Sequence, residues 1–314
     1  MKRYAVIDIG TLKVKSLIAS TSKNGELKEI YSSNTLTCFG CEMDANEGRV
    51  LEKNLLKTIN ELKRVKLLLE KHNVKNFKIV STHAMRRAKN RSVVKEKIKK
   101  EVGFKVDSIS QKKEAELFFQ AALRDFPENK EYAVLDMGGG SVQILIGDKH
   151  NLKKIHMMQT GAQFLHDNFT KDPSNPNGFT QLSEIEKMKR LILHELIPLK
   201  KTHNIPIVYG SSNIIDLMKA ISMPLKAHED SITHPYKTYS HHLREFMNQI
   251  IPIPYIKREE MYPFQWGYMW GIDKAFLNVT TIAKHLESPH IIPSNANIAQ
   301  GIIYSLANQS LSQE

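Results

Sequence analysis

The sequence predicts an α/β protein that contains two copies of one structural unit. Short β-rich runs alternate with amphipathic helical segments along the chain, which is typical of the α/β class. A length of 314 residues leaves room for two domains, each with its own hydrophobic core. The third observation is a repeat: YAVIDIGTLKVKSLIA at residues 4–19 returns as YAVLDMGGGSVQILIG at residues 132–147.

The repeated segment predicts a β-hairpin with an aspartate and a glycine at its tip. Each copy has an apolar β-rich run, a carboxylate where the run ends, a short turn and a second β-rich run. Two unrelated hairpins could look alike because sheet cores use few residue types, but this would not explain why aspartate and glycine keep their places. The identical pairs are Tyr4/Tyr132, Ala5/Ala133, Val6/Val134, Asp8/Asp136, Gly10/Gly138, Val14/Val142, Leu17/Leu145 and Ile18/Ile146.

The first half continues with alternating elements. A helix is expected over residues 52–71, because apolar residues recur there at helical spacing with lysine and glutamate on the other side. Gly103 is suited to end a later helix, since glycine is common just past the last turn. The other expected elements are strands at 29–36, 77–81 and 104–109 and helices at 92–102 and 112–123.

The second half begins after a polar, proline-containing segment at residues 124–131, which predicts domains at 1–125 and 126–314. After the repeated hairpin we expect a strand at 153–159, a helix at 182–196 and a strand at 205–209 that leads through a glycine turn into a helix. Residues 258–308 are expected to be mostly helical, with turns at Pro289 and Pro293.

Composition favours a polyanion as ligand. The net charge is +12 and the pI is near 9.4, and much of the excess lies in residues 86–113. The alternative for these lysines and arginines is a solvated helix face. The sequence contains no zinc-finger spacing, aromatic RNA-binding signature or basic tail, so nucleic acid is not the expected partner. With no signal peptide and no apolar run of membrane-spanning length, we expect a cytoplasmic protein that does not contact membranes.

The turn of the second hairpin predicts a phosphate cradle. Gly138, Gly139 and Gly140 lack Cβ atoms, so their backbone N–H groups can converge on an oxyanion, and Ser141 adds a hydroxyl. The alternative is a tight hairpin with positive φ angles, for which one or two glycines usually suffice. A carboxylate beside an anion needs a cation between them, and Mg²⁺ held through waters by Asp8 and Asp136 would supply it.

Three further positions are candidates for the same chemistry. Gly210, Ser211 and Ser212 form a turn between a strand and a helix, which suits an anion, although Ser212 could equally be an N-cap. Arg86 follows a strand, where its guanidinium could hold a phosphate through two bonds or could simply be exposed at a helix start. Glu114 lies where a strand gives way to a helix; it could act as a base toward water or complement the helix dipole.

These segments resemble the exopolyphosphatase/guanosine pentaphosphate phosphatase (Ppx/GppA) family. That family is a branch of the actin-like, sugar-kinase-like ATPase superfamily, whose two duplicated, ribonuclease H-like domains close on a phosphate-bearing ligand in a cleft between them. The resemblance covers nearly the whole chain. Its marks are DIG at 8–10, STHAMRRAKN at 81–90, SISQKKEAEL at 108–117, DMGGGS at 136–141, GSS at 210–212 and SNANIAQGIIY at 294–304.

The resemblance implies hydrolysis of a phosphoanhydride, with polyphosphate or a guanosine penta- or tetraphosphate as substrate. Glu114 matches the family's general base. The terminal phosphate would lie between the two hairpin turns, near Arg86, with Mg²⁺ at Asp8 and Asp136. The phosphate-binding residues would be Arg86, Gly10, Thr11, Lys13, Gly138, Gly139, Gly140, Ser141, Gly210, Ser211 and Ser212. The resemblance also implies a homodimer.

Several positions depart from the family pattern. They are Thr11-Leu12-Lys13 for Ser-Asn-Ser, Lys113 for a glutamate, Gln143 for a carboxylate, Asn213 for glycine, Asn295-Ala296 for Asp-Gly and Ala299-Gln300 for Arg-Glu. Two explanations are open. Either Lys13 and Lys113 take over part of the anion binding while Glu114 still acts, or the site binds phosphate or a nucleotide without efficient turnover and serves regulation. A sugar or acetate kinase would not explain the match around Arg86 and Glu114.

Overall fold

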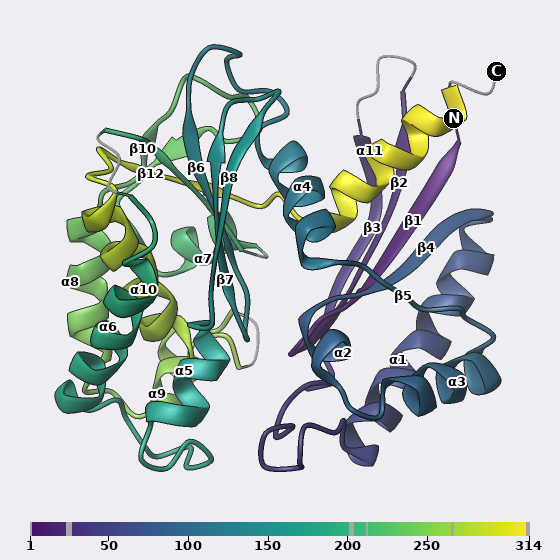
Figure 1. Cartoon of the computed structure of the whole chain (residues 1–314), viewed down its shortest axis with the longest axis horizontal. Helices are drawn as coiled ribbons and strands as arrows, with labels where there is room; N and C mark the ends of the chain where they lie inside the picture. The colour runs from purple at the N-terminus through teal and green to yellow at the C-terminus, as the bar shows by residue number, and fades with distance from the viewer. Residues whose placement is uncertain (1, 23–26, 201–203, 212, 265–266, 312–314) are drawn as a thin grey trace. The chain divides into compact units, whose positions relative to one another are not determined.

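The chain folds into two compact units (Figure 1). The structure is a computed structural model that describes residues 2–22, 27–200, 204–211, 213–264 and 267–311. The first unit contains the chain up to Ala121 together with the segment that begins at Asn297, and the second contains Ala122–Ala296. No helix in the described part of the chain is long and apolar enough to cross a membrane.

The first unit is built on a five-stranded sheet with the order β3-β2-β1-β4-β5. Its strands are β1 (Arg3–Ile9), β2 (Lys13–Thr21), β3 (Leu27–Leu36), β4 (Asn76–Ser81) and β5 (Asp107–Ser108). β1, β2 and β3 pair antiparallel, whereas β4 and β5 run parallel to β1. The carboxyl ends of β1, β4 and β5 therefore meet at one edge of the sheet.

Helices cover both faces of this sheet. They are α1 (Glu52–Lys71), α2 (His83–Arg87), α3 (Arg91–Val102), α4 (Gln111–Ala122) and α11 (Ile298–Leu311). Alternate residues of β1 enter two hydrophobic clusters, since side chains of a strand point to opposite faces. Ile7 packs with residues of α1 and α3, whereas Val6 packs with Leu117 of α4 and Ile302 of α11.

The second unit repeats this arrangement. Its five-stranded sheet has the order β12-β9-β6-β7-β8, with β6, β7 and β8 antiparallel and β9 and β12 parallel to β6. The strands are β6 (Tyr132–Met137), β7 (Val142–Gly147), β8 (Leu152–Met158), β9 (Ile207–Gly210) and β12 (Ile291–Ser294). The predicted duplicated α/β fold is thereby confirmed, and the cleft between the units stays a prediction.

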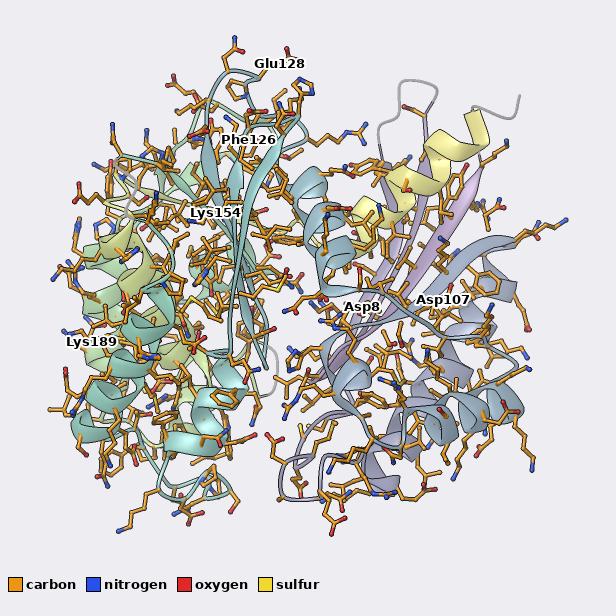
Figure 2. The ribbon with its side chains drawn as sticks, viewed as in Figure 1. Asp8, Asp107, Phe126, Glu128, Lys154 and Lys189 are labelled. Carbon is orange, nitrogen blue, oxygen red and sulfur yellow. The ribbon has the colours of Figure 1, made fainter. Side chains whose placement is uncertain are left out.

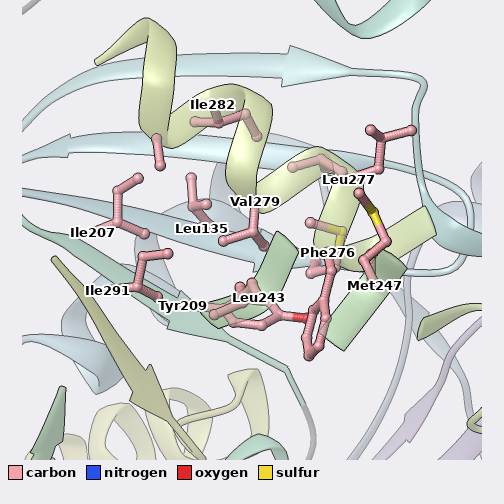
Figure 3. Packing of buried hydrophobic residues seen from close by; sticks show 14 of the residues in the cluster. Leu135, Ile207, Tyr209, Leu243, Met247, Phe276, Leu277, Val279, Ile282 and Ile291 are labelled. Carbon is pink, nitrogen blue, oxygen red and sulfur yellow. The ribbon is translucent and has the colours of Figure 1, made fainter. Parts of the chain in front are cut away.

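One buried helix organises the core of the second unit. Figure 3 shows Phe276, Val279 and Ile282 of α10 (Ile272–His285) against Leu135 and Ile291 of the sheet. The other elements are α5 (Ala162–Phe169), α6 (Leu182–Leu196), α7 (Ile214–Ala220), α8 (Ser240–Ile250), α9 (Tyr255–Met261) and a small two-stranded sheet of β10 (Lys226–Ala227) and β11 (Tyr236–Lys237).

The structure differs from the sequence-based expectations at three places. The strand expected at 104–109 shortens to β5. Pro293 lies in β12 rather than in a turn, which is possible because β12 is an edge strand of its sheet, where a missing N–H is tolerated. The chain after residue 125 does not form one domain, because α11 packs on the first sheet; the first change of unit falls between Ala121 and Ala122.

Candidate functional site

The first hairpin turn is held by a neighbouring loop. The N–H of Gly10 donates to the carbonyl of Lys13 at 3.0 Å, and a Cβ on Gly10 would lie 3.0 Å from that oxygen. The carbonyl of Thr11 accepts the N–H of Gly40 at 2.8 Å, and that of Leu12 accepts the N–H of Cys38 at 2.8 Å. The Cys38–Cys41 segment therefore supports the turn, and both cysteines are thiols.

The second hairpin turn has the same core geometry and a different support. The N–H of Gly138 donates to the carbonyl of Ser141 at 3.0 Å. The carbonyls of Gly138 and Gly139 accept the N–H groups of Ala162 and Phe164, at 3.2 and 2.9 Å, from the start of α5. These carbonyls point at α5, and the N–H groups of Gly139 and Gly140 have no acceptor within the described ranges. The turn therefore keeps N–H groups that could donate to an anion, and that it binds a phosphate stays a prediction.

Gly161 lets α5 approach this turn. A Cβ at this position would lie 2.4 Å from the amide nitrogen of Ser141 and 2.5 Å from the carbonyl carbon of Gly139. No side chain fits in that space, because real Cβ atoms essentially never come within 3.0 Å of such atoms. Gly161 was not among the predicted site residues, since its contact is made across the unit rather than along the chain.

The third predicted turn lies next to the second in the sheet. Gly210 of β9 pairs with Asp136 of β6 in the parallel ladder, so both end at the same edge. The hydroxyl of Ser211 lies 3.0 Å from that of Tyr268. Burial raises the pKa of Tyr268 to about 12, so it stays a neutral hydroxyl. Ser212 lies outside the described residues. The sequence carries no pattern that would have identified Tyr268.

Asp8 is a buried carboxylate that lacks a full set of partners. It is 5% exposed, and its Oδ1 atom is buried without a hydrogen-bond partner (Asp8 is labelled in Figure 2). Lys15 is its direct cross-strand neighbour on β2. Burial raises the pKa of Asp8 above its usual value, and the charges of Lys15 and Arg86 oppose this only in part. Lys15 was not predicted; the cross-strand register of the hairpin identifies it.

Arg86 and Glu114 contact each other directly. Nη1 of Arg86 lies 2.6 Å from Oε2 of Glu114, and it also donates to the carbonyl of Ile109 at 3.0 Å. Arg86 belongs to α2, which follows β4, and Glu114 to α4, which follows β5. Adjacent parallel strands thus bring together two residues that are 28 positions apart. Nη2 of Arg86 is buried and has no hydrogen-bond partner.

His83 adds no positive charge to this edge at neutral pH. Burial, together with the charges of Arg87 and Arg86, lowers its pKa to about 4. The first unit therefore presents two carboxylates, Asp8 and Glu114, near the guanidinium of Arg86. A phosphate that approached this set would be repelled by the carboxylate of Glu114, so an additional cation would help to hold it.

Asp8 could ligate Mg²⁺, but the described residues around it would hold the ion only weakly. The unpartnered Oδ1 of Asp8 is a suitable ligand for a hard cation. No group of three or more His, Cys, Asp or Glu side chains in the described part of the chain is arranged to hold a metal. A magnesium ion would therefore depend on waters and phosphate oxygens for most of its ligands, as Mg²⁺ commonly does.

Each unit brings its own predicted residues to one edge of its sheet. In the first unit these are Asp8, Gly10, Thr11, Lys13, Arg86 and Glu114. In the second they are Asp136, Gly138, Gly139, Gly140, Ser141, Gly210 and Ser211. That both sets bind one phosphate, and that Asp8 and Asp136 share one metal ion, stays a prediction.

Three departures from the family pattern keep a local hydrogen bond or backbone conformation. Asn213 adopts the left-handed region at φ 58°, which asparagine tolerates and glycine usually supplies. Oδ1 of Asn295 accepts the N–H of Ile215 at 3.0 Å, a role that an aspartate oxygen would also fill. Asn297 and Gln300 exchange two hydrogen bonds at the start of α11, in a capping box.

The departure at Gln143 places a neutral side chain where the family pattern has a carboxylate. Gln143 is 2% exposed, lies directly opposite Asp136 in the hairpin, and its Oε1 has no hydrogen-bond partner in the described structure. A glutamine oxygen can ligate a cation but brings no charge. A metal ion next to Asp136 would therefore be held less tightly than by two carboxylates.

Known proteins share the sequence pattern and the fold of this chain. Exopolyphosphatase 2 from Mycobacterium tuberculosis is 24% identical over 324 aligned residues that cover 98% of this chain and 99% of that protein. A solved Ppx/GppA family member from Aquifex aeolicus is 25% identical with a TM-score of 0.79, and the match covers 98% of both chains. An exopolyphosphatase structure from Cytophaga hutchinsonii, 20% identical over 98% of both chains, has the same fold with a TM-score of 0.84.

The sequence also matches a model of a protein family. Residues 18–310 match the model of the Ppx/GppA phosphatase family, which is most of the chain. The match begins within β2, after the first hairpin turn, and includes the Arg86–Glu114 pair, the glycine turn at 138–140 and nearly all of the last helix, α11. The chain belongs to the Ppx/GppA phosphatase family.

Proposed function

We propose that this protein is a phosphohydrolase that releases the terminal phosphate of inorganic polyphosphate. The observation that carries the proposal is the contact of a base candidate, Glu114, with an anion-binding candidate, Arg86, beside the buried carboxylate of Asp8. The M. tuberculosis relative is named an exopolyphosphatase, which supports polyphosphate as the substrate. Donors without acceptors at Gly139 and Gly140 suit a second set of phosphate oxygens.

Hydrolysis of a phosphoanhydride requires a base for the attacking water and hydrogen-bond donors for the phosphate oxygens. Glu114 would accept a proton from water as the water oxygen bonds to the terminal phosphorus. The bond between that phosphorus and the bridging oxygen breaks, and the shortened polyphosphate leaves with the bonding electron pair. Arg86 and the turn N–H groups would stabilise the charge on the transferred phosphoryl oxygens, which is the main demand of phosphoryl transfer.

Mg²⁺ would be held by Asp8 and, in the second unit, by Asp136. When bound, it would neutralise charge on the phosphate oxygens. The role of Asp8 is supported by its buried, unpartnered Oδ1 atom. Since Gln143 stands opposite Asp136 where the family pattern has a carboxylate, the demand for free Mg²⁺ should be high.

Guanosine pentaphosphate carries the same terminal phosphoanhydride and is the second substrate to test. A different function, phosphate or nucleotide binding for regulation without turnover, is favoured by one observation: the neutral Gln143. Both functions use the same donors, so they differ in turnover rather than in binding.

The test compares phosphate release by the wild-type protein and Glu114→Gln on long-chain polyphosphate and guanosine pentaphosphate, over a range of Mg²⁺ concentrations. We expect the wild type to release phosphate at least 100-fold faster than the variant, since general base catalysis contributes roughly 10²–10⁴-fold. Equal rates on both substrates would refute the hydrolase proposal. Tight binding of either substrate without release would then support the regulatory function.

A further inference from the structure

Arg86 pairs with Glu114 through Nη1, and the same atom would be needed to hold a phosphate at the Nη1–Nη2 edge. Nη1 carries two hydrogens, and the structure accounts for both: one faces Oε2 of Glu114 at 2.6 Å and the other the carbonyl of Ile109 at 3.0 Å. Nη2 is buried and has no acceptor. A phosphate held by two N–H groups of the Nη1–Nη2 edge must therefore replace one of the two partners of Nη1.

Glu114 is the partner that can leave. The carbonyl of Ile109 is fixed in the backbone just after β5, whereas a glutamate side chain can change rotamer. Glu114 would also repel the phosphate, because both are anions next to one guanidinium. Ile109 would keep Arg86 anchored after Glu114 has moved.

The paired state also restrains Glu114 as a base. One of its carboxylate oxygens is held by a charge-assisted hydrogen bond of 2.6 Å. Such a bond favours the ionised form, so an ion-paired carboxylate accepts a proton from water less readily than an unpaired one. Release from Arg86 would therefore restore the basicity that the reaction needs.

We propose that Arg86 is a positioning residue for Glu114 as well as a phosphate ligand. In the protein without ligand it holds the carboxylate in an ion pair, and an arriving terminal phosphate takes the Nη1 donor and releases Glu114 toward the attacking water. The base is then available only when a phosphate occupies Arg86. This inference rests on the proposed function of the site and adds a substrate-dependent step to it.

Binding of a pyrophosphate analogue tests the competition without turnover. Methylenebisphosphonate has a carbon bridge that the reaction cannot cleave, and its affinity in the presence of Mg²⁺ can be measured by titration calorimetry. Glu114→Gln should bind it about tenfold more tightly than wild type, because Nη1 no longer has to give up a charged partner. Glu101→Gln is the control: this exposed glutamate lies on α3 of the same unit, pairs with Lys63 at 3.2 Å and should leave affinity unchanged.

The same substitution in a second background separates competition from a general charge effect. In Arg86→Met, and in Arg86→Lys should the methionine variant fail to fold, Glu114→Gln should give less than a threefold gain. An equal gain in both backgrounds would show that only the local charge matters and would overturn the proposal. Weaker binding by Glu114→Gln in the wild-type background, or no measurable binding to either protein, would do the same.

A spectroscopic measurement gives a result even where binding to the arginine variants is weak. In protein labelled with ¹³C at glutamate Cδ, the Glu114 resonance is the one missing from Glu114→Gln. Saturation of wild type with methylenebisphosphonate should move it in the direction that Arg86→Met moves it without ligand. An unmoved resonance at saturation would refute the release of Glu114. Phosphate release from polyphosphate is measured separately. Hydrolysis without movement of Glu114 would refute this inference and keep the proposed function, whereas movement of Glu114 without hydrolysis would refute the proposed function alone.

Discussion

Three of the departures from the family pattern keep a structural role that a family residue would fill. Asn213 keeps the left-handed turn, Asn295 keeps an acceptor for the N–H of Ile215, and Gln300 keeps the cap of α11. None of the three needs a carboxylate in these roles. Oε1 of Gln143 has no hydrogen-bond partner in the described structure, so the loss of charge at this position bears directly on the proposed metal binding.

Gly161 is the residue whose replacement should disturb the second turn most. In Gly161→Ala the new Cβ would lie 2.4–2.5 Å from backbone atoms of Ser141 and Gly139, which cannot move without breaking the turn. The φ of Gly161 is −57°, so alanine adds no backbone strain and the effect is steric. We expect the free energy of unfolding, measured with urea, to fall by about 2 kcal/mol or more.

The control for this substitution is Gly271→Ala, whose Cβ would meet only the Ala162 side chain, at 3.3 Å. That contact needs a shift of a few tenths of an ångström, and the loss of stability should be clearly smaller. Equal losses of unfolding free energy in the two variants would mean that the close approach of Gly161 to the turn is not the reason why alanine destabilises the protein at position 161.

The residues found from sequence share one property: they stand where a strand ends. Asp8, Asp136 and Gly210 lie in the last two residues of strands that carry apolar runs. Arg86 lies in the short helix that follows β4, and Glu114 lies in the first turn of the helix that follows β5. Such positions can be read from local pattern. Lys15, Tyr268 and Gly161 were missed because their roles come from pairing across a hairpin or packing between distant segments, which a single sequence does not show.

At the scale of elements, the start of α10 contains the most heavily buried charges of the second unit. Asp273 and Lys274 are both 0% exposed, as is Arg258 of α9, and Oδ2 of Asp273 lies 3.3 Å from Nη1 of Arg258 and 3.1 Å from Nζ of Lys274. Tyr255 packs against both cations, whose charges lie 4.7 and 4.8 Å from its ring centre. One carboxylate and one aromatic face thus stabilise two buried cations.

Removal of the carboxylate should be costly. Asp273→Asn would leave Arg258 and Lys274 buried without a counter-charge, which typically costs about 3–5 kcal/mol. We expect a loss of this size in the free energy of unfolding followed by Trp270 fluorescence, since Trp270 stacks on Tyr255 at 5.3 Å. Glu260→Gln on α9 breaks an exposed pair with Lys257 and should cost less than about 1 kcal/mol. A loss below that of the control would contradict the role of Asp273.

β12 shows why an element can be missed. Its four residues include Pro293, and proline usually argues against a strand. The sequence cannot show that this strand lies at the edge of the sheet, where its neighbour β9 covers one side only. Long periodic helices such as α1, by contrast, were predicted with the bounds that they have, because their apolar spacing is a local property.

At the scale of the whole molecule, buried histidines should make the protein sensitive to acid. Burial lowers the pKa of His166 to about 4, with a further contribution from Lys274; the side chain is 3% exposed. The folded-state pKa lies below the unfolded value of about 6.5, so the unfolded chain binds the proton first as pH falls. The stability is complete above pH 6.5 and is lost as pH falls from there toward 4.

The expected size of this effect is about 2 kcal/mol at pH 5 for His166 alone. His166→Gln should reduce the difference in unfolding free energy between pH 7.5 and pH 5.0 by that amount, measured with urea and Trp270 fluorescence. His150→Gln is the control, since His150 is exposed, and its pH dependence should match the wild type. A difference in the His166 variant as large as in the wild type would mean that this side chain is protonated in the folded state.

The chain returns to its first unit at the end, so that unit should depend on its last helix. Ile298, Ile302 and Ile303 of α11 are buried against β1, β2 and α4, and full burial of each such side chain contributes about 1.5–3 kcal/mol. Their sum is comparable with the 5–15 kcal/mol that stabilises a typical domain. A chain that ends after Ala296 should therefore lose the folded first unit, while one that ends after Leu311 should keep it.

The two tryptophans make this visible, because positions 266 and 270 both fall within the second unit. In the chain that ends after Ala296, the urea transition followed by tryptophan fluorescence should persist. The far-UV ellipticity should be lower than in the wild type, and the transition that it reports should lack the part due to the first unit. In the chain that ends after Leu311, both signals should match the wild type. If the shorter chain kept full ellipticity and the wild-type transition, α11 would be an appendage to the first sheet rather than part of its core, and the sequence-based boundary at residue 125 would describe folding better than the contacts do.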